Sequence, residues 1–218
     1  MAKGHFIVLE GLDGSGTTTQ GHRLAAELSR RGRRTIFTNE PSRGPVGAVL
    51  ALFLSKRLSL SPGGPERVLG PDLMALLFAA DRLDHLDHEV LPALEAGVHV
   101  VCDRYVASSF AYQMAGGRDN LEWLREINRR AVRPDVTLFL RTPAEVCAAR
   151  RGLSRTEESL FERIDEQRRI EANYDLVFDR LATEGEPIVV LDGGRTLPEV
   201  EAEILAHLDE RFPDLAGR

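Results

Sequence analysis

The segment FIVLEGLDGSGTTTQ, residues 6–20, decides the fold. It starts with an apolar run, FIVLE, which predicts a buried strand, and it continues through a glycine-rich turn into a helical pattern at about residues 17–31. Gly11 and Gly16 have the G-x-x-x-x-G spacing of a loop that binds nucleotide phosphates. Glycines let such a loop turn its backbone N–H groups toward phosphate oxygens, and the N-terminus of the following helix favours the same negative charge. The segment therefore predicts a strand, a phosphate-binding loop and a helix.

The residues after Gly16 differ from the usual form of this loop. They are normally Lys and then Ser or Thr, whereas here they are Thr17 and Thr18. Thr18 retains the hydroxyl that binds magnesium, but Thr17 replaces the cation that binds phosphates. A glycine-rich turn that binds no nucleotide is the alternative for this segment taken alone. If the loop does bind a nucleoside triphosphate, the residues expected to contact its phosphates are Gly11, Gly14, Ser15, Gly16, Thr17, Thr18 and Thr19.

Further apolar runs alternate with helical patterns along the rest of the chain. Their lack of polar alternation is typical of parallel strands that are covered on both faces. We therefore expect an α/β protein of three layers. The expected strands are residues 6–10, 35–38, 98–102, 136–140 and 187–192, and the expected helices are about 17–31, 72–96, 121–132, 143–151, 157–182 and 197–211. Residues 41–71 and 151–161 have a less regular pattern, so we expect them to be mobile or to face a ligand.

Composition places the chain among ordinary globular proteins. Its 218 residues are 43% hydrophobic and 28% charged, which argues against disorder and fits one domain over residues 1–218. The net charge of −6 gives no support for binding nucleic acid or an anionic membrane. No apolar stretch of about 18 residues and no signal-peptide core occur, so we expect a cytoplasmic protein. Cys102 and Cys147 lack the spacing of a metal site, which predicts buried thiols in a reducing compartment.

Five motifs together resemble the thymidylate kinase family, in order and spacing over nearly the whole chain. They are GLDGSGTTTQ (11–20), FTNEP (37–41), LLFAADR (76–82), DRY with SSFAYQ (103–105 and 108–113) and RPDVTLFL (133–140). This resemblance implies the three-layer P-loop fold of nucleoside-monophosphate kinases, with a five-stranded parallel sheet. It also implies transfer of the γ-phosphate of ATP to dTMP, which forms dTDP and ADP with Mg²⁺ as the cofactor, in a homodimer.

The base of dTMP is assigned to two helices. Phe78 and Arg82 are four residues apart on one helix face, so a ring and a guanidinium can contact the same small ligand. The resemblance implies that Phe78 stacks on thymine and that Arg82 donates to a base carbonyl. Ser109 and Gln113, also four apart, are expected to read the pyrimidine edge, with Tyr112 closing against the sugar. A core Phe and a surface Arg on an amphipathic helix are the alternative for the first pair.

The phosphates are assigned to residues at the strand ends. Asp103 follows the third strand directly, where open α/β sheets bind their ligands. The resemblance implies that Asp103, with Thr18, organises magnesium and water, and that Arg104 bridges the phosphates of donor and acceptor. It places Asp13 near the acceptor sugar or the metal, and Glu40 near the acceptor phosphate or the metal. A structural ion pair is the alternative for Asp103 and Arg104, and a turn-capping role is the alternative for Glu40.

The lid of such kinases corresponds here to about residues 150–162. In bacterial-type members that have no Arg within the phosphate loop, the lid supplies arginine to the donor phosphates. The resemblance assigns this role to Arg150, Arg151 and Arg155. Arginine is the expected substitute for the missing lysine, since 26 of the 28 basic residues are arginines. A solvated charged face is the alternative for each of the three.

Two departures from the family pattern affect the transfer chemistry. SLFE, residues 159–162, stands where the lid usually has Asp-Arg, an apolar residue and Glu. Asn39 stands where many bacterial members have Arg, although Arg43 is close enough in sequence to reach the acceptor phosphate. Thr17 and the altered lid leave open a catalytically degenerate homologue that binds nucleotides. Residue types alone do not show whether the pocket accepts the methyl group of thymine, so a kinase for another pyrimidine deoxynucleotide such as dUMP is the second alternative.

Overall fold

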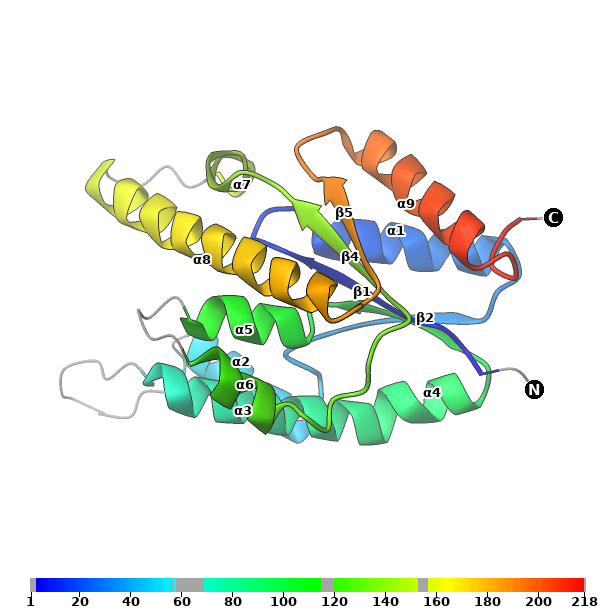
Figure 1. Cartoon of the computed structure of the whole chain (residues 1–218), viewed down its shortest axis with the longest axis horizontal. Coiled ribbons are helices and arrows are strands. Elements are labelled where there is room, and N and C mark those ends of the chain that lie inside the picture. The colour runs from blue at the N-terminus through cyan, green and yellow to red at the C-terminus, as the bar shows by residue number, and fades with distance from the viewer. Residues whose placement is uncertain (1–2, 56, 58–68, 115–119, 153–156, 218) are drawn as a thin grey trace.

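The centre of the molecule is a five-stranded parallel sheet (Figure 1). The computed structural model describes residues 3–55, 57, 69–114, 120–152 and 157–217, apart from the side chains of 157–163. Its strands lie in the order β2-β3-β1-β4-β5. They are β1 (Phe6–Gly11), β2 (Thr35–Asn39), β3 (His99–Asp103), β4 (Val136–Arg141) and β5 (Ile188–Asp192). The predicted α/β class and all five predicted strands are confirmed.

Helices cover both faces of this sheet, which confirms the three layers. Their bounds are α1 (Thr17–Arg30), α2 (Pro45–Leu54), α3 (Pro71–His85), α4 (Leu91–Glu95), α5 (Val106–Met114), α6 (Leu121–Ile127), α7 (Ala144–Arg150), α8 (Glu157–Thr183) and α9 (Leu197–Arg211). The helix predicted over 72–96 is present as one helical run over 71–95, in which a π-helical turn, Leu86–Val90, joins α3 to α4. None of the described helices is long and apolar enough to cross a membrane.

The sequence analysis missed α2, which lies in the segment expected to lack regular structure. Pro45 occupies its first turn, where the fixed φ of proline favours a helix start. The sequence PVGAVLALFL is apolar on every side, so it lacks the period by which an amphipathic helix is recognised. α2 packs against α3. Residues 58–68 of the same segment, and 153–156 of the other irregular segment, lie outside the described residues.

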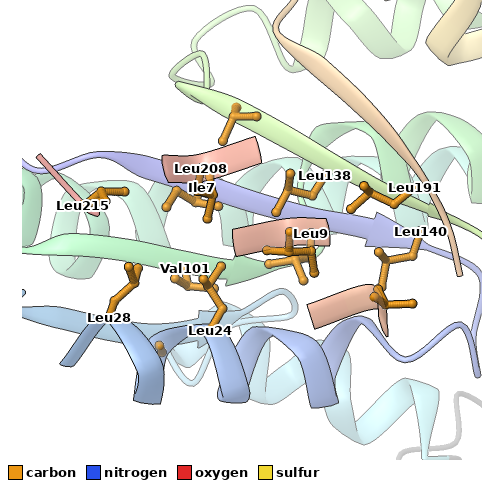
Figure 2. Close-up of a cluster of buried hydrophobic side chains, with 14 residues drawn as sticks. Ile7, Leu9, Leu24, Leu28, Val101, Leu138, Leu140, Leu191, Leu208 and Leu215 are labelled. Atoms are coloured by element: carbon orange, nitrogen blue, oxygen red, sulfur yellow. The ribbon is translucent and has the colours of Figure 1, made fainter. Parts of the chain in front are cut away.

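The first face of the sheet packs against α1 and α9. Figure 2 shows this cluster, in which Ile7 and Leu9 of β1 contact leucines of α1 such as Leu24 and of α9 such as Leu208. Each fully buried side chain of this kind stabilises the fold by roughly 1.5–3 kcal/mol. Gly32 follows α1 with a left-handed φ of 80°, as expected of a glycine that ends a helix.

The opposite face packs against α3, α4, α5 and α8 (Figure 1). Phe6 and Val8 point to this side, because alternate residues of a strand face opposite ways. Cys102 and Cys147 are buried there as free thiols, as predicted. Since β1 is buried on both sides, its carboxyl end holds the following loop in a fixed position relative to the ends of β2 and β3.

Candidate active site

The loop after β1 has the backbone shape that its glycines predict. Gly14 and Gly16 have φ values of 94° and 99°, a left-handed conformation that other residues rarely adopt. A Cβ on Gly14 would lie 2.6 Å from the carbonyl oxygen of Cys147, so the neighbouring chain also requires glycine. Gly16 precedes α1, whose first N–H groups have no partner within the helix. The loop and the start of α1 can therefore bind phosphate.

The threonines of α1 lie on different sides of its first turn. Thr17 is buried, and Thr19 is exposed. Thr18 Oγ1 donates a hydrogen bond to Asp103 Oδ2, and Asp103 Oδ1 is buried without a partner among the described residues. Mg²⁺ prefers oxygen ligands and typically takes one or two carboxylates together with phosphates and water. This hydroxyl and carboxylate fit such an ion, and no cluster of three or more metal-binding side chains occurs in the described part of the chain.

Arg104 is held against the phosphate-binding loop. Its Nη1 donates to the carbonyl oxygen of Gly11 at 3.0 Å, and its Nη2 donates to Asp13 Oδ1 at 2.6 Å. Tyr112 Oη donates to the same Asp13 oxygen at 3.1 Å, and the Arg104 guanidinium lies 5.1 Å from the centre of the Tyr112 ring. The structure thus brings together three of the predicted site residues.

The backbone of Arg104 is strained. Its φ is 71°, and a left-handed conformation costs a non-glycine residue roughly 1–3 kcal/mol. The backbone N–H of Arg104 donates to the carbonyl oxygen of Leu9 at 2.8 Å, which fixes the residue at the end of the sheet. Such strain persists only where the surrounding structure compensates for it, and it is typical of functional sites.

A buried cluster behind Arg104 was missed by the sequence analysis. Glu10 accepts hydrogen bonds from the backbone N–H groups of Tyr105 at 2.9 Å and Ser108 at 3.1 Å, and from Tyr174 Oη at 3.2 Å. Ser108 Oγ and Tyr174 Oη in turn accept from Arg104 Nη1 at 3.2 and 3.3 Å. Burial raises the pKa of Glu10 above its usual value. The signal that could have found this cluster is the carboxylate that ends the apolar run FIVLE.

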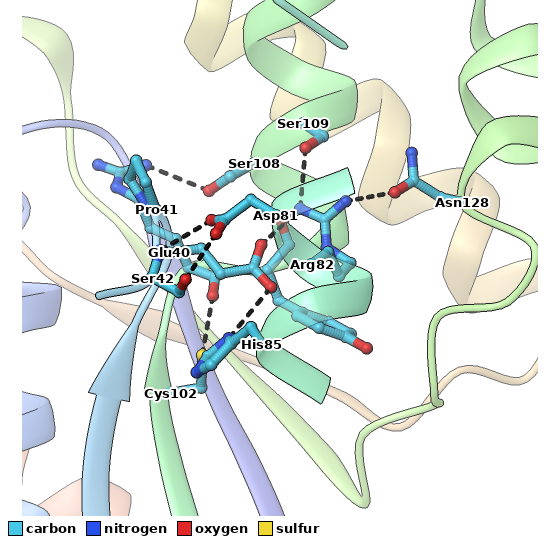
Figure 3. A network of polar contacts seen from close by, with 12 residues as sticks. Glu40, Pro41, Ser42, Asp81, Arg82, His85, Cys102, Ser108, Ser109 and Asn128 are labelled. Carbon is cyan, nitrogen blue, oxygen red and sulfur yellow. Dashed lines mark hydrogen bonds and ion pairs between the residues drawn. The ribbon is translucent and has the colours of Figure 1, made fainter. Parts of the chain in front are cut away.

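Arg82 is 1% exposed and lies at the centre of a polar network (Figure 3). Its Nη2 donates to Glu40 Oε2 at 2.6 Å, to Ser109 Oγ at 2.9 Å and to the carbonyl oxygen of Tyr105 at 3.2 Å. Its Nη1 donates to Asn128 Oδ1, and its Nε has no partner among the described residues. The carboxylate of Glu40, expected near the acceptor phosphate or the metal, is therefore paired with the arginine expected to read the base.

Two further contacts fix the segment that carries Glu40. Asp81, next to Arg82 on α3, accepts from the backbone N–H of Ser42 at 2.7 Å and from Ser42 Oγ at 2.5 Å. All of these groups are buried, which makes the contacts between the end of β2 and α3 insensitive to solvent.

The other residues expected to bind the base lie on packed helices. Phe78 is one turn before Arg82 on α3 and is partly exposed. α3 packs against α5, which carries Ser109 and Gln113 on one face. Gln113 is buried, and its Oε1 has no partner among the described residues. The residues expected to bind the base thus lie on two helices that pack against each other.

Arg150 is bound by main-chain oxygens. Its Nη1 donates to the carbonyl oxygens of Ser15 at 3.3 Å and Gly193 at 2.9 Å, and its Nη2 donates to those of Gly194 and Arg195. This side chain ties the phosphate-binding loop to the turn after β5, which leaves less of its donor capacity for a nucleotide.

The remaining arginines expected to bind phosphate differ in their positions. Arg151 lies beside the loop, where its Nη1 is 3.9 Å from Asp13 Oδ2 and its Cγ is close to Gly14. Arg43 is exposed at the start of the segment that leads to α2. Arg155 lies outside the described residues. Arg151 is thus the described lid arginine that is best placed for the donor phosphates.

Comparison with known proteins agrees with this geometry. The sequence pattern of the thymidylate kinase family matches residues 9–204. A probable thymidylate kinase of Thermococcus kodakarensis is 43% identical over 175 residues, which are 78% of this chain and 82% of that protein. A probable thymidylate kinase of Pyrococcus abyssi is 38% identical over 94% of this chain and 95% of that protein. A thymidylate kinase of Neisseria gonorrhoeae is 37% identical over 96% of this chain and 98% of that protein. With a family match over most of its length and relatives that it covers almost completely, the chain belongs to the thymidylate kinase family.

Proposed function

We propose that the chain transfers the γ-phosphate of ATP to dTMP, which yields dTDP and ADP. Arg104 carries this proposal, because it joins the two halves of the site. Its guanidinium binds Gly11 and Asp13 of the phosphate-binding loop, and its backbone lies just before α5, which carries Ser109 and Gln113 on the base side. Phosphoryl transfer requires two phosphates in line and positive charge between them, and Arg104 is placed to supply that charge.

The donor side is assigned to the loop and α1. Gly11, Gly14, Ser15, Gly16 and the threonines that follow would surround the ATP phosphates with backbone N–H groups. Thr18 and Asp103 would hold Mg²⁺, which shields phosphate charge when it is bound. Thr17 carries no charge, so Arg151 would supply the cation that a lysine normally provides. Arg150 would hold the shape of the loop, and Arg155 would belong to the same lid.

The acceptor side is assigned to α3 and α5. Phe78 would stack on the thymine ring. The N–H of Arg82 Nε, buried without a partner among the described residues, would donate to a base carbonyl. A buried donor without an acceptor costs roughly 1–3 kcal/mol, so a carbonyl there is favourable. Gln113 would bind the pyrimidine edge, with Asp13 and Tyr112 near the sugar.

Glu40 and Arg43, both expected near the acceptor phosphate, are assigned different roles. Glu40 would act through Arg82, because its carboxylate is already paired with that guanidinium. Arg43 would bind the acceptor phosphate directly, since it is exposed close to the end of β2.

The same proposal covers organisation and partners. Strands of one sheet come from residues 6 to 192, which supports a single kinase domain over 1–218 with a lid at about 150–162. A homodimer through α2 and α3 is supported by apolar side chains that are exposed on these packed helices, namely Val49, Leu52, Leu54, Leu73, Leu76 and Leu83. The two free buried cysteines support a cytoplasmic location. ATP and dTMP are the proposed partners, with no role for nucleic acid or membrane.

Separate titrations with dTMP and ATP test the assignment of the base. We expect Phe78→Ala to weaken dTMP binding by about 5- to 150-fold, because stacking on one aromatic ring contributes roughly 1–3 kcal/mol. ATP affinity and melting temperature should change little, since Phe78 is partly exposed. An equal loss for both nucleotides, or unaltered dTMP binding, would overturn the assignment.

A further inference from the structure

Asn128 is a buried amide that none of the family motifs includes. It directly follows α6 and is 7% exposed. Its Nδ2 donates to the carbonyl oxygen of Leu124 at 2.8 Å, and its Oδ1 accepts from Arg82 Nη1 (Figure 3). These two partners fix the orientation of the amide. Rotation by half a turn would set an NH₂ group against a guanidinium and an oxygen against a carbonyl.

The hydrogen bonds of Arg82 are unevenly distributed over its three nitrogens. Nη2 has three acceptors, from Glu40, Ser109 and Tyr105, whereas Nη1 has the Asn128 oxygen and Nε has none among the described residues. A guanidinium is planar, so fixing both Nη atoms also fixes the direction of the Nε–H bond. The contact with Asn128 therefore determines where the remaining donor points.

Among the described residues, Asn128 is the one hydrogen-bond partner of Arg82 Nη1. The three acceptors of Nη2 hold one corner of the guanidinium, and the Tyr105 ring lies against its face with its centre 5.2 Å from Cζ, so the contact with Asn128 is what holds the plane against rotation about that corner. A cavity of about 490 Å³ lies beside Asn128, and Tyr105, Phe110 and Phe178 are among the residues that line it. Loss of the amide oxygen would therefore leave space rather than packed atoms at this point.

We propose that Asn128 is a positioning residue that sets base selectivity by holding the guanidinium of Arg82. The inference rests on the proposed function, in which Arg82 donates to a carbonyl of the base. A donor of fixed direction favours a carbonyl oxygen and disfavours the amino group that cytosine carries in its place. A guanidinium that can turn loses this discrimination, because it can avoid the amino group.

Equilibrium titration of dTMP and dCMP against three variants tests this role. Asn128→Leu removes the acceptor at similar volume, Asn128→Asp keeps an oxygen for Arg82 but loses the donor to the Leu124 carbonyl oxygen, and Asn120→Ala changes the opposite end of α6 without touching Arg82. We expect Asn128→Leu to lower the dTMP-to-dCMP affinity ratio by about 10-fold or more, by analogy with sites whose buried donors read a substrate group. Asn128→Asp should retain most of the ratio, and Asn120→Ala should leave the ratio unchanged. The ATP affinity should be unchanged in all three variants.

The outcomes separate positioning from stability. An Asn128→Leu protein that melts earlier but keeps the dTMP-to-dCMP ratio would overturn the inference. If this variant does not fold, Asn128→Ser gives the same comparison with a shortened side chain. Arg82→Lys is titrated in parallel to keep the two claims apart. If Arg82→Lys changes the dTMP-to-dCMP affinity ratio and Asn128→Leu does not, the role of Asn128 is refuted. If neither variant changes this ratio, the assignment of Arg82 to the base is refuted.

Discussion

Thr18 Oγ1 donates a hydrogen bond to Asp103 Oδ2, and this contact joins the first turn of α1 to the end of β3. The two residues are far apart in sequence, but β1 and β3 are neighbours in the sheet, with Leu9 opposite Asp103. A hydroxyl and a carboxylate thus meet at the phosphate-binding loop, where a divalent ion bound to ATP would lie.

Asp103→Asn tests whether this carboxylate takes part in transfer. The amide keeps the size of the side chain and can still accept from Thr18, but it loses the charge that would bind Mg²⁺ and order the phosphates. We expect turnover to fall by at least about 10²-fold, as for the loss of a preorganised electrostatic group. Steady-state kinetics and thermal melting of the same preparation check this. A lower melting temperature with nearly normal turnover would instead favour a structural ion pair.

Arg82 and Glu40 provide a test of the buried ion pair. Both side chains are buried, so Arg82→Met leaves the buried Glu40 carboxylate without its arginine partner. We expect this change to lower the free energy of unfolding by about 3–5 kcal/mol. Adding Glu40→Gln should restore part of the stability while dTMP binding stays weak. Urea denaturation and dTMP titration of the single and double variants measure both effects. Restored dTMP binding in the double variant would contradict the role of Arg82.

The neutral Thr17 leads to a prediction about Arg151. If Arg151 provides the cation at the donor phosphates, Arg151→Ala should lower turnover by about 10²-fold with a small change in ATP affinity, as expected of a group engaged mainly in the transition state. Thr17→Lys should restore activity to this variant and add little to the unaltered protein. ADP production by the two single variants and the double variant is the measurement.

Arg150→Ala is the matched control for Arg151→Ala. Arg150 binds the carbonyl oxygens of Ser15 and Gly193, so its loss should loosen the loop and weaken ATP binding. Thr17→Lys should not rescue it. A catalytically degenerate homologue would give a different pattern, in which turnover is negligible at the outset and Thr17→Lys alone produces a large gain.

Glu10 gives the stability a dependence on pH. Burial raises its pKa above 4.5 in the folded chain, so the folded state binds this proton more tightly than the unfolded state. Ionisation of Glu10 therefore lowers the free energy of unfolding as the pH rises above 4.5. The glutamine in Glu10→Gln cannot ionise. As the pH rises above 4.5, we therefore expect the free energy of unfolding of this variant to increase relative to that of the unaltered protein. Urea denaturation at several pH values checks the trend, and a constant difference between the two proteins would contradict it.

The strands and the phosphate-binding loop were predictable because their signals are local. An apolar run such as FIVLE and the glycines at 14 and 16 constrain the backbone directly. α2 escaped prediction since an all-apolar helix has no period to detect. The end of α6 at Ile127 was also missed. There the side chain of Asn128 bonds to the carbonyl oxygen of Leu124, and such local bonds compete with helix continuation.

The sequence predicted which residues belong to the candidate site better than it predicted which of them contact one another. Motif resemblance named Arg82, Glu40, Arg104 and Asp13, but not that Glu40 binds Arg82 or that Asp13 binds Arg104. Such pairings depend on side-chain geometry between distant segments, which sequence spacing does not constrain. The supporting residues were missed for the same reason, since a Tyr in the middle of α8, such as Tyr174, carries no local mark of its contact with Arg104.

ADP release in the presence of ATP, Mg²⁺ and a panel of nucleoside monophosphates tests the central claim most directly. The proposed site predicts release that depends on the acceptor and is fastest with dTMP, with dUMP slower and dCMP and AMP near background. A higher rate with dUMP than with dTMP would assign the chain to another pyrimidine nucleotide. Absence of turnover with every pyrimidine monophosphate would contradict the claim that the chain is a kinase.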